Sequence, residues 1–312
     1  MAMSDPMPTN SARPRRGPGR AARRSAGTPY EVGSFVHDGV RLAYEVHGTG
    51  EQVLVFLHGI LLSADLNRRL AGDLAAAGHR VVLLDLPGHG RSDKPRRASS
   101  HRIDTYARHV VALLDHLGVE RAVVGGVSLG GNVSLMVAAL APERVQGLVV
   151  EMPVLEWAVP AAALTFVPLL FAVHFARPVA AAVASVARRV PRTGLGPLDS
   201  VLGTLANDPR ETAAVLHGVL AGPLGPTVGE RASMTVPALV IGHRSDGVHP
   251  FHDAEQLADR LPEARLVQAR SILELWVRPD RLTGEIIALL DEAWRRDASE
   301  PGGAARAPRR AG

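Results

Sequence analysis

A serine between two glycines is the residue of this chain whose setting most suggests covalent chemistry. Ser128 lies between Gly126 and Gly130 in the segment G-V-S-L-G, after an apolar run and at the start of a helical pattern. Glycines permit a sharp turn and a close approach of strand and helix. A serine hydroxyl becomes a strong nucleophile when a base takes its proton. The segment predicts a nucleophilic serine, with a helix cap as the alternative role.

Two further polar loops follow apolar runs. His58 and Gly59 come directly after the run 52–57, and a loop from Asp85 to Ser92 follows the run 79–84. Each apolar run is typical of a buried strand, and helical patterns at 66–77 and 103–117 separate the runs. Apolar strands that alternate with helices favour a parallel sheet covered on both faces. We therefore expect Ser128 to lie at the carboxyl ends of the strands, where open α/β sheets bind ligands.

The remaining elements divide the chain into a sheet domain and an insertion. Residues 34–46 read as a hairpin around an Asp-Gly turn, and strands are expected at 146–151, 237–242 and 264–268. Residues 153–235 are helical, Ala-rich and interrupted by Pro and Gly. We expect a core built from residues 29–152 and 236–297, with residues 153–235 as a helical lid.

The charge of the chain is concentrated in its ends. The formal net charge is +4, yet residues 1–28 carry six Arg and one Asp, and residues 295–312 carry five Arg against two carboxylates. The body is therefore mildly acidic and shows no basic surface with interleaved aromatic residues, which argues against nucleic-acid binding. Residues 1–28 and 298–312 offer little apolar area, and we expect both to be disordered tails.

Composition also limits the chemistry and the cellular setting. There is no cysteine, which excludes disulfides and thiolate nucleophiles. No metal-binding or nucleotide-binding motif is present, so we expect neither a metal nor a cofactor. The N-terminal residues lack the apolar segment of a secretory signal, and we expect a cytoplasmic protein. The apolar run 161–176 is short for a membrane span, which favours a lid over an apolar pocket, with adsorption to a lipid surface as the alternative.

Three ordered motifs give the chain a resemblance to the α/β-hydrolase superfamily, in its lidded esterase, lipase and epoxide-hydrolase-like forms. The segment L-H-G-I at 57–60 resembles the family's oxyanion loop, the segment D-L-P-G-H-G-R-S at 85–92 resembles a second family loop, and G-x-S-x-G at 126–130 resembles its nucleophile elbow. The resemblance implies an α/β-hydrolase fold over about residues 33–297. It also implies that Ser128 is the nucleophile and that the backbone N–H groups of Ile60 and Leu129 form the oxyanion hole.

The resemblance also implies an acid. Asp246 matches the family's triad aspartate in a loop that follows the strand 237–242, with a simple turn residue as the alternative and Glu151 as a second candidate acid. For His58 and His89 we expect scaffold roles within their loops. Serine at the elbow argues against epoxide-hydrolase and dehalogenase chemistry, which in this family uses a carboxylate nucleophile.

The base does not fit the family pattern. The family's histidine should follow the strand 264–268, where this chain has Ile272, and no histidine occurs after His252. His249 on the acid loop is the candidate base, with a surface histidine as the other interpretation. Glu274 is another candidate base, although a charge that faces solvent is the simpler interpretation of this residue. His174 and His217 in the insertion are expected to be polar positions on amphipathic helices.

These observations favour one function and leave others open. We expect a serine-dependent hydrolase of a small or lipophilic ester, weak because Ile272 occupies the usual histidine position. The alternative is a non-catalytic member of the fold that binds an apolar ligand under its lid. A cofactor-free lyase or peroxidase-like reaction in the same pocket is a third interpretation.

Overall fold

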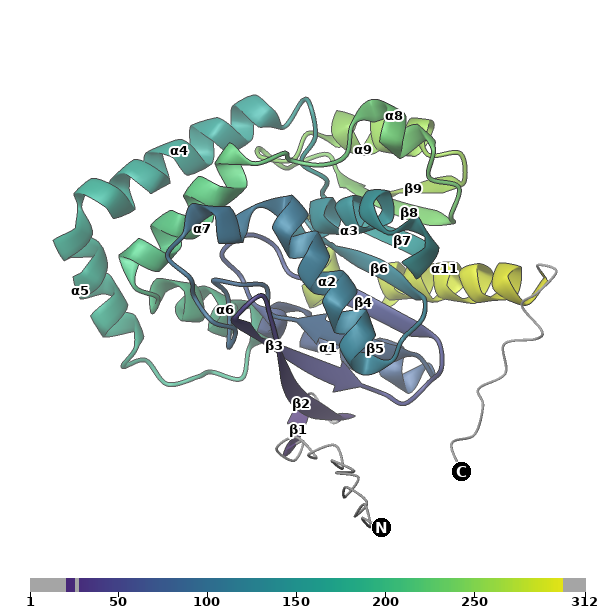
Figure 1. Ribbon diagram of the computed structural model, residues 1–312, viewed down its shortest axis with the longest axis horizontal. Helices are drawn as coiled ribbons and strands as arrows, with labels where there is room; N and C mark the ends of the chain where they lie inside the picture. The colour runs from purple at the N-terminus through teal and green to yellow at the C-terminus, as the bar shows by residue number, and fades with distance from the viewer. Residues whose placement is uncertain (1–20, 26–27, 300–312) are drawn as a thin grey trace, which may run out of the picture.

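A twisted sheet forms the centre of the molecule. The computed structural model describes residues 21–25 and 28–299, and within them nine strands form one sheet in the order β1-β2-β3-β5-β4-β6-β7-β8-β9 (Figure 1). The first three strands and β5 pair antiparallel, and every pair from β5 to β9 is parallel. The strands are β1 (Ala21–Ser25), β2 (Thr28–His37), β3 (Val40–His47), β4 (Val53–Leu57), β5 (Arg80–Leu84), β6 (Ala122–Val127), β7 (Val145–Glu151), β8 (Ala238–His243) and β9 (Ala264–Ala269).

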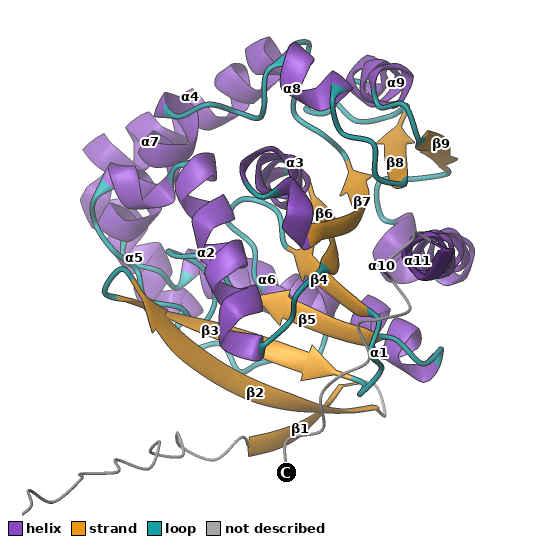
Figure 2. Ribbon diagram, turned by 45° about the vertical axis from the view of Figure 1, so that its right-hand side comes forward, coloured by secondary structure: helices purple, strands orange, loops and turns teal. Residues whose placement is uncertain are grey.

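Helices cover both faces of this sheet (Figure 2). The core helices are α1 (Arg68–Ala76), α2 (Ile103–Leu117), α3 (Leu129–Leu140), α9 (Phe251–Arg260), α10 (Glu274–Val277) and α11 (Asp280–Ser299). The inserted helices are α4 (Val159–Phe175), α5 (Arg177–Ala187), α6 (Gly196–Leu205), α7 (Pro209–Ala221) and α8 (Val228–Ala232). The connections also contain short 3-10 helices, which are η1 (Ala64–Asn67), η2 (Ala98–His101) and η3 (Pro142–Arg144). The prediction of a mostly parallel sheet with helices on both faces and a helical insertion is confirmed.

The strands divide the apolar core into two layers. Val55 and Leu57 of β4 point to the layer that packs against α2, α3 and α9, whereas Leu54 and Phe56 point to the layer under α1 and α11. This alternation follows from the two-residue period of a strand. Both faces of each central strand are buried, which explains why the parallel strands read as continuous apolar runs.

The hairpin and the helix ends follow local sequence signals. β2 and β3 are joined through Asp38 and Gly39, whose φ angles are 50° and 74°. Two successive positive φ angles are those of the Asn-Gly or Asp-Gly hairpin turn. Helix α2 ends at Gly118 in the left-handed conformation, with φ of 64°. The turn at 38–39 and the bounds of α2 agree with the sequence predictions.

The chain ends differ from expectation where they are described. We expected disorder throughout residues 1–28, but Ala21–Ser25 forms the edge strand β1 paired with β2, and Thr28 begins β2. At the other end α11 continues to Ser299, beyond the expected core boundary at residue 297. Backbone pairing at a free sheet edge needs no apolar side chains, so composition gave no signal for β1. Residues 1–20, 26–27 and 300–312 lie outside the described residues.

Candidate active site

Ser128 occupies a strained turn at the carboxyl end of β6. Its φ and ψ are 52° and −113°, which a non-glycine residue rarely adopts, and its side chain is half-buried. Its backbone N–H donates to the carbonyl of Glu151 at 2.8 Å. Such strain persists only where the surroundings fix it, and it is common at functional sites. The turn lifts the hydroxyl out of the sheet at the edge where open parallel sheets bind ligands.

The glycines around the serine are required by close packing. A Cβ on Gly126 would lie 2.7 Å from the carbonyl oxygen of Leu57, and one on Gly130 would lie 2.5 Å from the same atom. Both distances are far inside van der Waals contact, so neither position tolerates a side chain without movement of backbone. The absence of Cβ atoms lets α3 and β4 approach each other at the elbow.

His249 contacts the serine hydroxyl. Its Nε2 lies 2.9 Å from Oγ of Ser128, and its Nδ1 lies 2.8 Å from Oδ2 of Asp246. A carboxylate can only accept, so Nδ1 carries the hydrogen and Nε2 is left to accept the hydrogen bond from the serine O–H. The His249 side chain is only 16% exposed, so it is not a surface histidine.

Asp246 is held in place by its own loop. The backbone N–H groups of Val248 and His249 donate to Oδ1 at 2.8 and 3.1 Å, while Oδ2 faces the imidazole. Burial alone would raise the pKa of Asp246, but the hydrogen bonds from His249 and the backbone outweigh it and lower the pKa to about 2. The carboxylate therefore stays charged at neutral pH and fixes the tautomer of the histidine.

The loop after β4 lies beside the serine. A Cβ built on Gly59 would be 3.8 Å from Cβ of Ser128. The next amides are all engaged: Leu61 N–H donates to Nε2 of His89, Leu62 N–H to the Gly59 carbonyl, and Ser63 N–H to Oγ of Ser200. Within the described residues the N–H of Ile60 has no such partner.

A second backbone donor without a partner among the described residues lies at the start of α3. Leu129 is the first residue of that helix, where backbone N–H groups have no intrahelical acceptor. The structure therefore leaves the amides of both predicted oxyanion residues, Ile60 and Leu129, available beside Ser128.

His58 and His89 fasten the two loops together. Nδ1 of His58 donates to the Gly59 carbonyl at 2.8 Å, and its Nε2 accepts from the Leu86 N–H at 3.1 Å. Nδ1 of His89 donates to the Pro87 carbonyl at 3.0 Å. Burial lowers the pKa of both imidazoles, which keeps them neutral. Because all their ring nitrogens are occupied, neither is free to act as a base toward the serine.

The comparison with protein families agrees with this arrangement. A family model described as the alpha/beta hydrolase fold matches residues 52–270. The chain belongs to this family. The match includes the serine turn, the loop after β4 and the loop that carries Asp246 and His249.

Individual relatives of this α/β-hydrolase match it in part. The dihydrolipoyllysine-residue acetyltransferase component of the acetoin cleaving system of Pseudomonas putida is 46% identical over 106 residues, which are 34% of this chain and 28% of the relative. A 2-hydroxy-6-oxononadienedioate/2-hydroxy-6-oxononatrienedioate hydrolase of Burkholderia vietnamiensis is 40% identical over 122 residues, 37% of this chain and 42% of the relative. The chain thus aligns with less than half the length of either curated relative.

A solved structure extends the likeness to nearly the whole fold. The enol-lactonase of Burkholderia xenovorans LB400 superimposes with a TM-score of 0.68 over 83% of this chain and 100% of that chain. The two sequences are 22% identical, so this likeness concerns the fold.

The position where α/β-hydrolases usually place the histidine lies in the loop after β9. Ile272 in this loop is 42% exposed. Glu274, the other candidate there, was expected to face solvent, and that prediction is wrong. Its side chain is 6% exposed and pairs with Arg281 at 2.9 Å, and although burial opposes it, the pKa of Glu274 is lowered by Arg281. This ion pair gives Glu274 a structural role.

A second acid–histidine pair lies behind the serine, and sequence reasoning found only one half of it. Nε2 of His243 is 3.0 Å from Oε1 of Glu151, and Nδ1 is 3.1 Å from the Ser271 carbonyl. Both side chains are buried, and burial raises the pKa of Glu151 against the opposing hydrogen bond from His243. Nδ1 must donate to the carbonyl, so the pair shares one further proton between Oε1 and Nε2 and carries no net charge.

The helical insertion is anchored close to the site. Asn132 on α3 donates to the carbonyls of Val154 and Leu224, at the two ends of the insertion, at 2.6 Å each. Ser200 of α6 accepts from the Ser63 amide at 2.7 Å. The inserted helices are thus tied both to the nucleophile helix and to the loop after β4. His174 and His217 on these helices are exposed.

Proposed function

We propose that this protein is a serine hydrolase that cleaves a small or lipophilic ester by an acyl-enzyme mechanism. The observation that carries the proposal is the continuous chain of contacts from Ser128 Oγ to His249 Nε2 at 2.9 Å and from His249 Nδ1 to Asp246 Oδ2 at 2.8 Å. Nucleophile, base and orienting carboxylate in this order are the elements of serine acyl transfer on unrelated folds.

The first half of the reaction is acylation. Nε2 of His249 takes the proton from the hydroxyl of Ser128 as Oγ attacks the ester carbonyl carbon. The carbonyl π bond opens to a tetrahedral oxyanion, and the resulting imidazolium is stabilised by the Asp246 carboxylate. When the C–O bond to the leaving group breaks, His249 returns the proton to the departing alkoxide, and the acyl group remains on Ser128.

The second half is hydrolysis of the acyl-enzyme. His249 removes a proton from a water molecule, the hydroxide adds to the acyl carbonyl, and the carboxylic acid leaves as Oγ is protonated again. The N–H groups of Ile60 and Leu129 receive the oxyanion in both halves. Loss of one such donor costs about 3–4 kcal/mol of transition-state stabilisation in comparable enzymes.

The loop that carries Asp246 also supplies a base, His249, which the family's usual histidine position at Ile272 lacks. Ile272 in the family's histidine position was the reason to expect weak activity. It was also the reason to consider a non-catalytic protein that binds an apolar ligand. The contact of His249 with Ser128 removes that reason, so we favour a competent enzyme. The names of the relatives, among them a hydrolase and a lactonase, support hydrolysis of an acyl carbonyl without fixing the substrate.

Active-site labelling tests the proposal. A fluorophosphonate probe should modify wild-type protein at Ser128, identified by peptide mass spectrometry, and should not modify Ser128→Ala. Ser134→Ala is the matched control, because Ser134 lies on the same helix and its hydroxyl donates to the Gly130 carbonyl. The wild type should also hydrolyse p-nitrophenyl esters, and a series of acyl chain lengths would define the preferred substrate. Wild-type protein that neither reacts with the probe nor turns over any ester would contradict the proposal.

A further inference from the structure

Helix α4 is apolar on all sides yet largely exposed. All its residues except Thr165 and His174 are apolar, and only Ala162 is fully buried. The hydroxyl of Thr165 donates to the Ala161 carbonyl at 2.8 Å, so this polar group is satisfied within the helix. Soluble domains do not normally expose a helix of this composition, because large apolar patches on a surface mark an interaction site.

The exposed side chains of α4 form a continuous stripe. Leu164, Phe171 and Phe175 are 78%, 56% and 73% exposed, and their spacing of seven and four residues places them on one face. The opposite face, which carries Phe166 and Leu170, is partly covered. Figures 1 and 2 show α7 between α4 and the rest of the molecule, with α4 at the outer edge.

Helix α5 repeats the pattern. Val179, Val183 and Val186 are 65%, 45% and 62% exposed, at spacings of four and three residues on one face. Among the described residues, 14 of the 21 exposed large apolar side chains fall between residues 159 and 205. The apolar surface is thus concentrated on the insertion, and we call the exposed stripes of α4 and α5 the lid face.

The charged residues within the segment that carries the lid face are all basic. No Asp or Glu occurs between Glu156 and Asp199, whereas Arg177, Arg188 and Arg189 lie at the ends of α5. These three side chains are exposed and form no ion pair with a carboxylate in the described residues; Arg177 instead contacts His174, and Arg189 donates to Ser185. An anionic surface would neutralise them.

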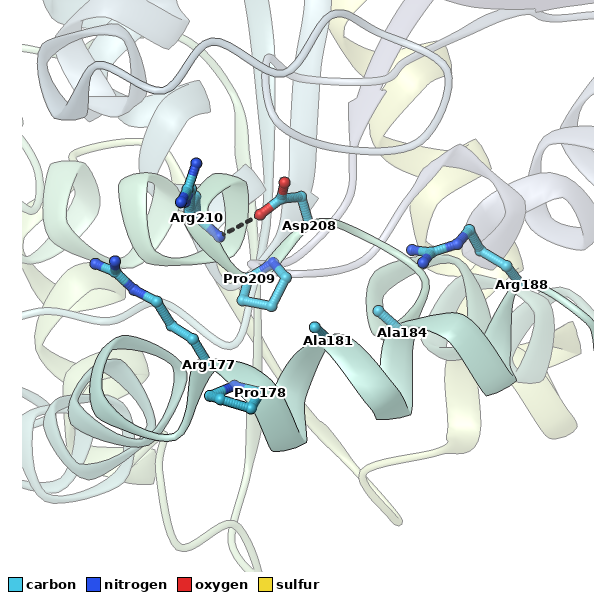
Figure 3. Close-up of a pocket in the computed structure, with 8 residues that line it drawn as sticks. All are labelled: Arg177, Pro178, Ala181, Ala184, Arg188, Asp208, Pro209 and Arg210. Carbon is cyan, nitrogen blue, oxygen red and sulfur yellow. Dashed lines mark hydrogen bonds between the residues drawn. The ribbon is translucent and has the colours of Figure 1, made fainter.

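A basic cavity lies on the other side of α5. It has a volume of about 380 Å³ between α5 and the start of α7, and Arg177, Arg188 and Arg210 line it (Figure 3). The one carboxylate there, Asp208, already accepts from Arg96 at 3.0 Å and from the Arg210 amide at 2.8 Å. The valine stripe and this cavity lie on opposite sides of one helix, the arrangement of a helix with its apolar side in acyl chains and its arginines at the level of the phosphates.

We propose that the lid face is a membrane-docking surface that inserts into the interface of a bilayer containing anionic phospholipid. None of the described helices is by itself long and apolar enough to cross a membrane, and α4 and α5 together pass such a test only as a pair bent by 95°. Two helices at this angle suit attachment to one leaflet better than a crossing. The docking is independent of the hydrolase chemistry.

The charges favour lipid over a second copy of this chain. A symmetric dimer places the same patch on both partners, so Arg177, Arg188 and Arg189 would face a patch that carries arginines and no carboxylate. Anionic headgroups supply that negative charge, and acyl chains accept the leucine and phenylalanine stripe.

Vesicle flotation tests the docking surface. Full-length protein should float with vesicles of phosphatidylcholine plus phosphatidylglycerol, bind more weakly to phosphatidylcholine alone, and bind less at high salt. Leu164→Asp/Phe171→Asp should reduce partitioning at least about tenfold, because each substitution places a charge in the acyl region. Val179→Asp/Val186→Asp makes the same change on α5 and should likewise reduce partitioning. Arg188→Gln/Arg189→Gln should lower binding about fivefold per arginine and reduce the preference for phosphatidylglycerol.

Val36→Asp is the matched control. Val36 is 68% exposed on β2, outside the insertion, and its substitution should leave partitioning unchanged. Circular dichroism melts establish that each variant is folded. Wild type that stays unbound with both vesicle types would overturn the proposal, as would aspartate variants that bind like wild type. A concentration-dependent dimer that these same substitutions abolish, without vesicle binding, would assign the lid face to self-association instead.

Discussion

Nδ1 of His249 lies 2.8 Å from Oδ2 of Asp246, so two members of the candidate triad come from one loop and are separated by only three positions. The usual α/β-hydrolase arrangement takes these residues from loops after two different strands. Here the loop after β8 reaches Ser128 without help from the loop after β9. The Asp246 carboxylate also accepts a hydrogen bond from the backbone N–H of His249. The backbone of this loop therefore helps to position the base.

A histidine introduced at the usual family position should add nothing. Ile272→His places an imidazole in the loop after β9, but Ser128 already donates to His249, and Asp246 already accepts from His249 and two amides. We expect kcat/KM for a p-nitrophenyl ester to stay within about twofold of wild type. A rise of tenfold or more would show that His249 is a poor base and that the family position was functionally empty.

The elbow glycines should tolerate no side chain. Gly130→Ala brings a Cβ to 2.5 Å from the Leu57 carbonyl, and we expect a loss of about 1–3 kcal/mol in the free energy of unfolding, measured in urea. Gly284→Ala is the control, because Gly284 lies within α11 with open space around it. That change should stabilise the protein by about 0.5–1 kcal/mol. Equal stability of the two variants would mean that the contact between α3 and β4 is looser than the structure shows.

The contribution of the buried Glu151–His243 pair to stability should depend on hydrogen bonding more than on charge. Glu151→Gln can donate an amide hydrogen to Nε2 of a neutral His243, so we expect a stability change within about 1 kcal/mol. Glu151→Ala leaves Nε2 buried without a partner and should cost about 1–3 kcal/mol in urea unfolding. If both variants lost the same stability, the carboxylate charge itself would be the stabilising feature.

Acid stability should depend on a buried carboxylate in β3. Burial alone would raise the pKa of Glu45, but hydrogen bonds from His47 and Arg68, together with the charges of Arg68 and Arg91, lower it to about 2. Between its ordinary value of 4.5 and about 2, the unfolded chain binds a proton there that the folded protein does not. This carboxylate's contribution is therefore complete above about pH 4.5 and is lost as the pH falls toward 2.

Glu45→Gln should remove that part of the pH dependence. We expect the slope of unfolding free energy against pH in this window to fall by up to about 1.4 kcal/mol per pH unit relative to wild type. Glu51→Gln, an exposed carboxylate in the loop before β4, controls for the loss of a negative charge. An unchanged slope in Glu45→Gln would show that the carboxylate titrates alike in the folded and unfolded chain.

Much of the sheet could be predicted from the sequence because each strand is buried on both faces and each turn has a local signal. The strand β4, the helix α2 and the turn at Asp38 and Gly39 depend on residues adjacent in the chain. The position of His249 could not be derived in this way. Its contact with Ser128 joins residues 121 positions apart, and it depends on how one loop folds over the end of the sheet.

The missed features share that physical cause. Glu274 is charged and close to a sheet end, and only its contact with Arg281 shows that it is buried. The pairing of Glu151 with His243 crosses from β7 to β8, and single-sequence patterns carry no information about such partners. The lid face was visible in the sequence as an apolar run, but its exposure is a property of how α4 packs on α7.

Steady-state ester hydrolysis by His249→Ala tests the central claim most directly, with His252→Ala as the matched control. His252 is an exposed histidine three residues further along the chain. We expect kcat/KM of His249→Ala to fall by about 10²–10⁴-fold, because general-base assistance contributes rates of this order, while His252→Ala and the thermal midpoints stay close to wild type. A folded His249→Ala variant that retains wild-type turnover would contradict the assignment of His249 as the base.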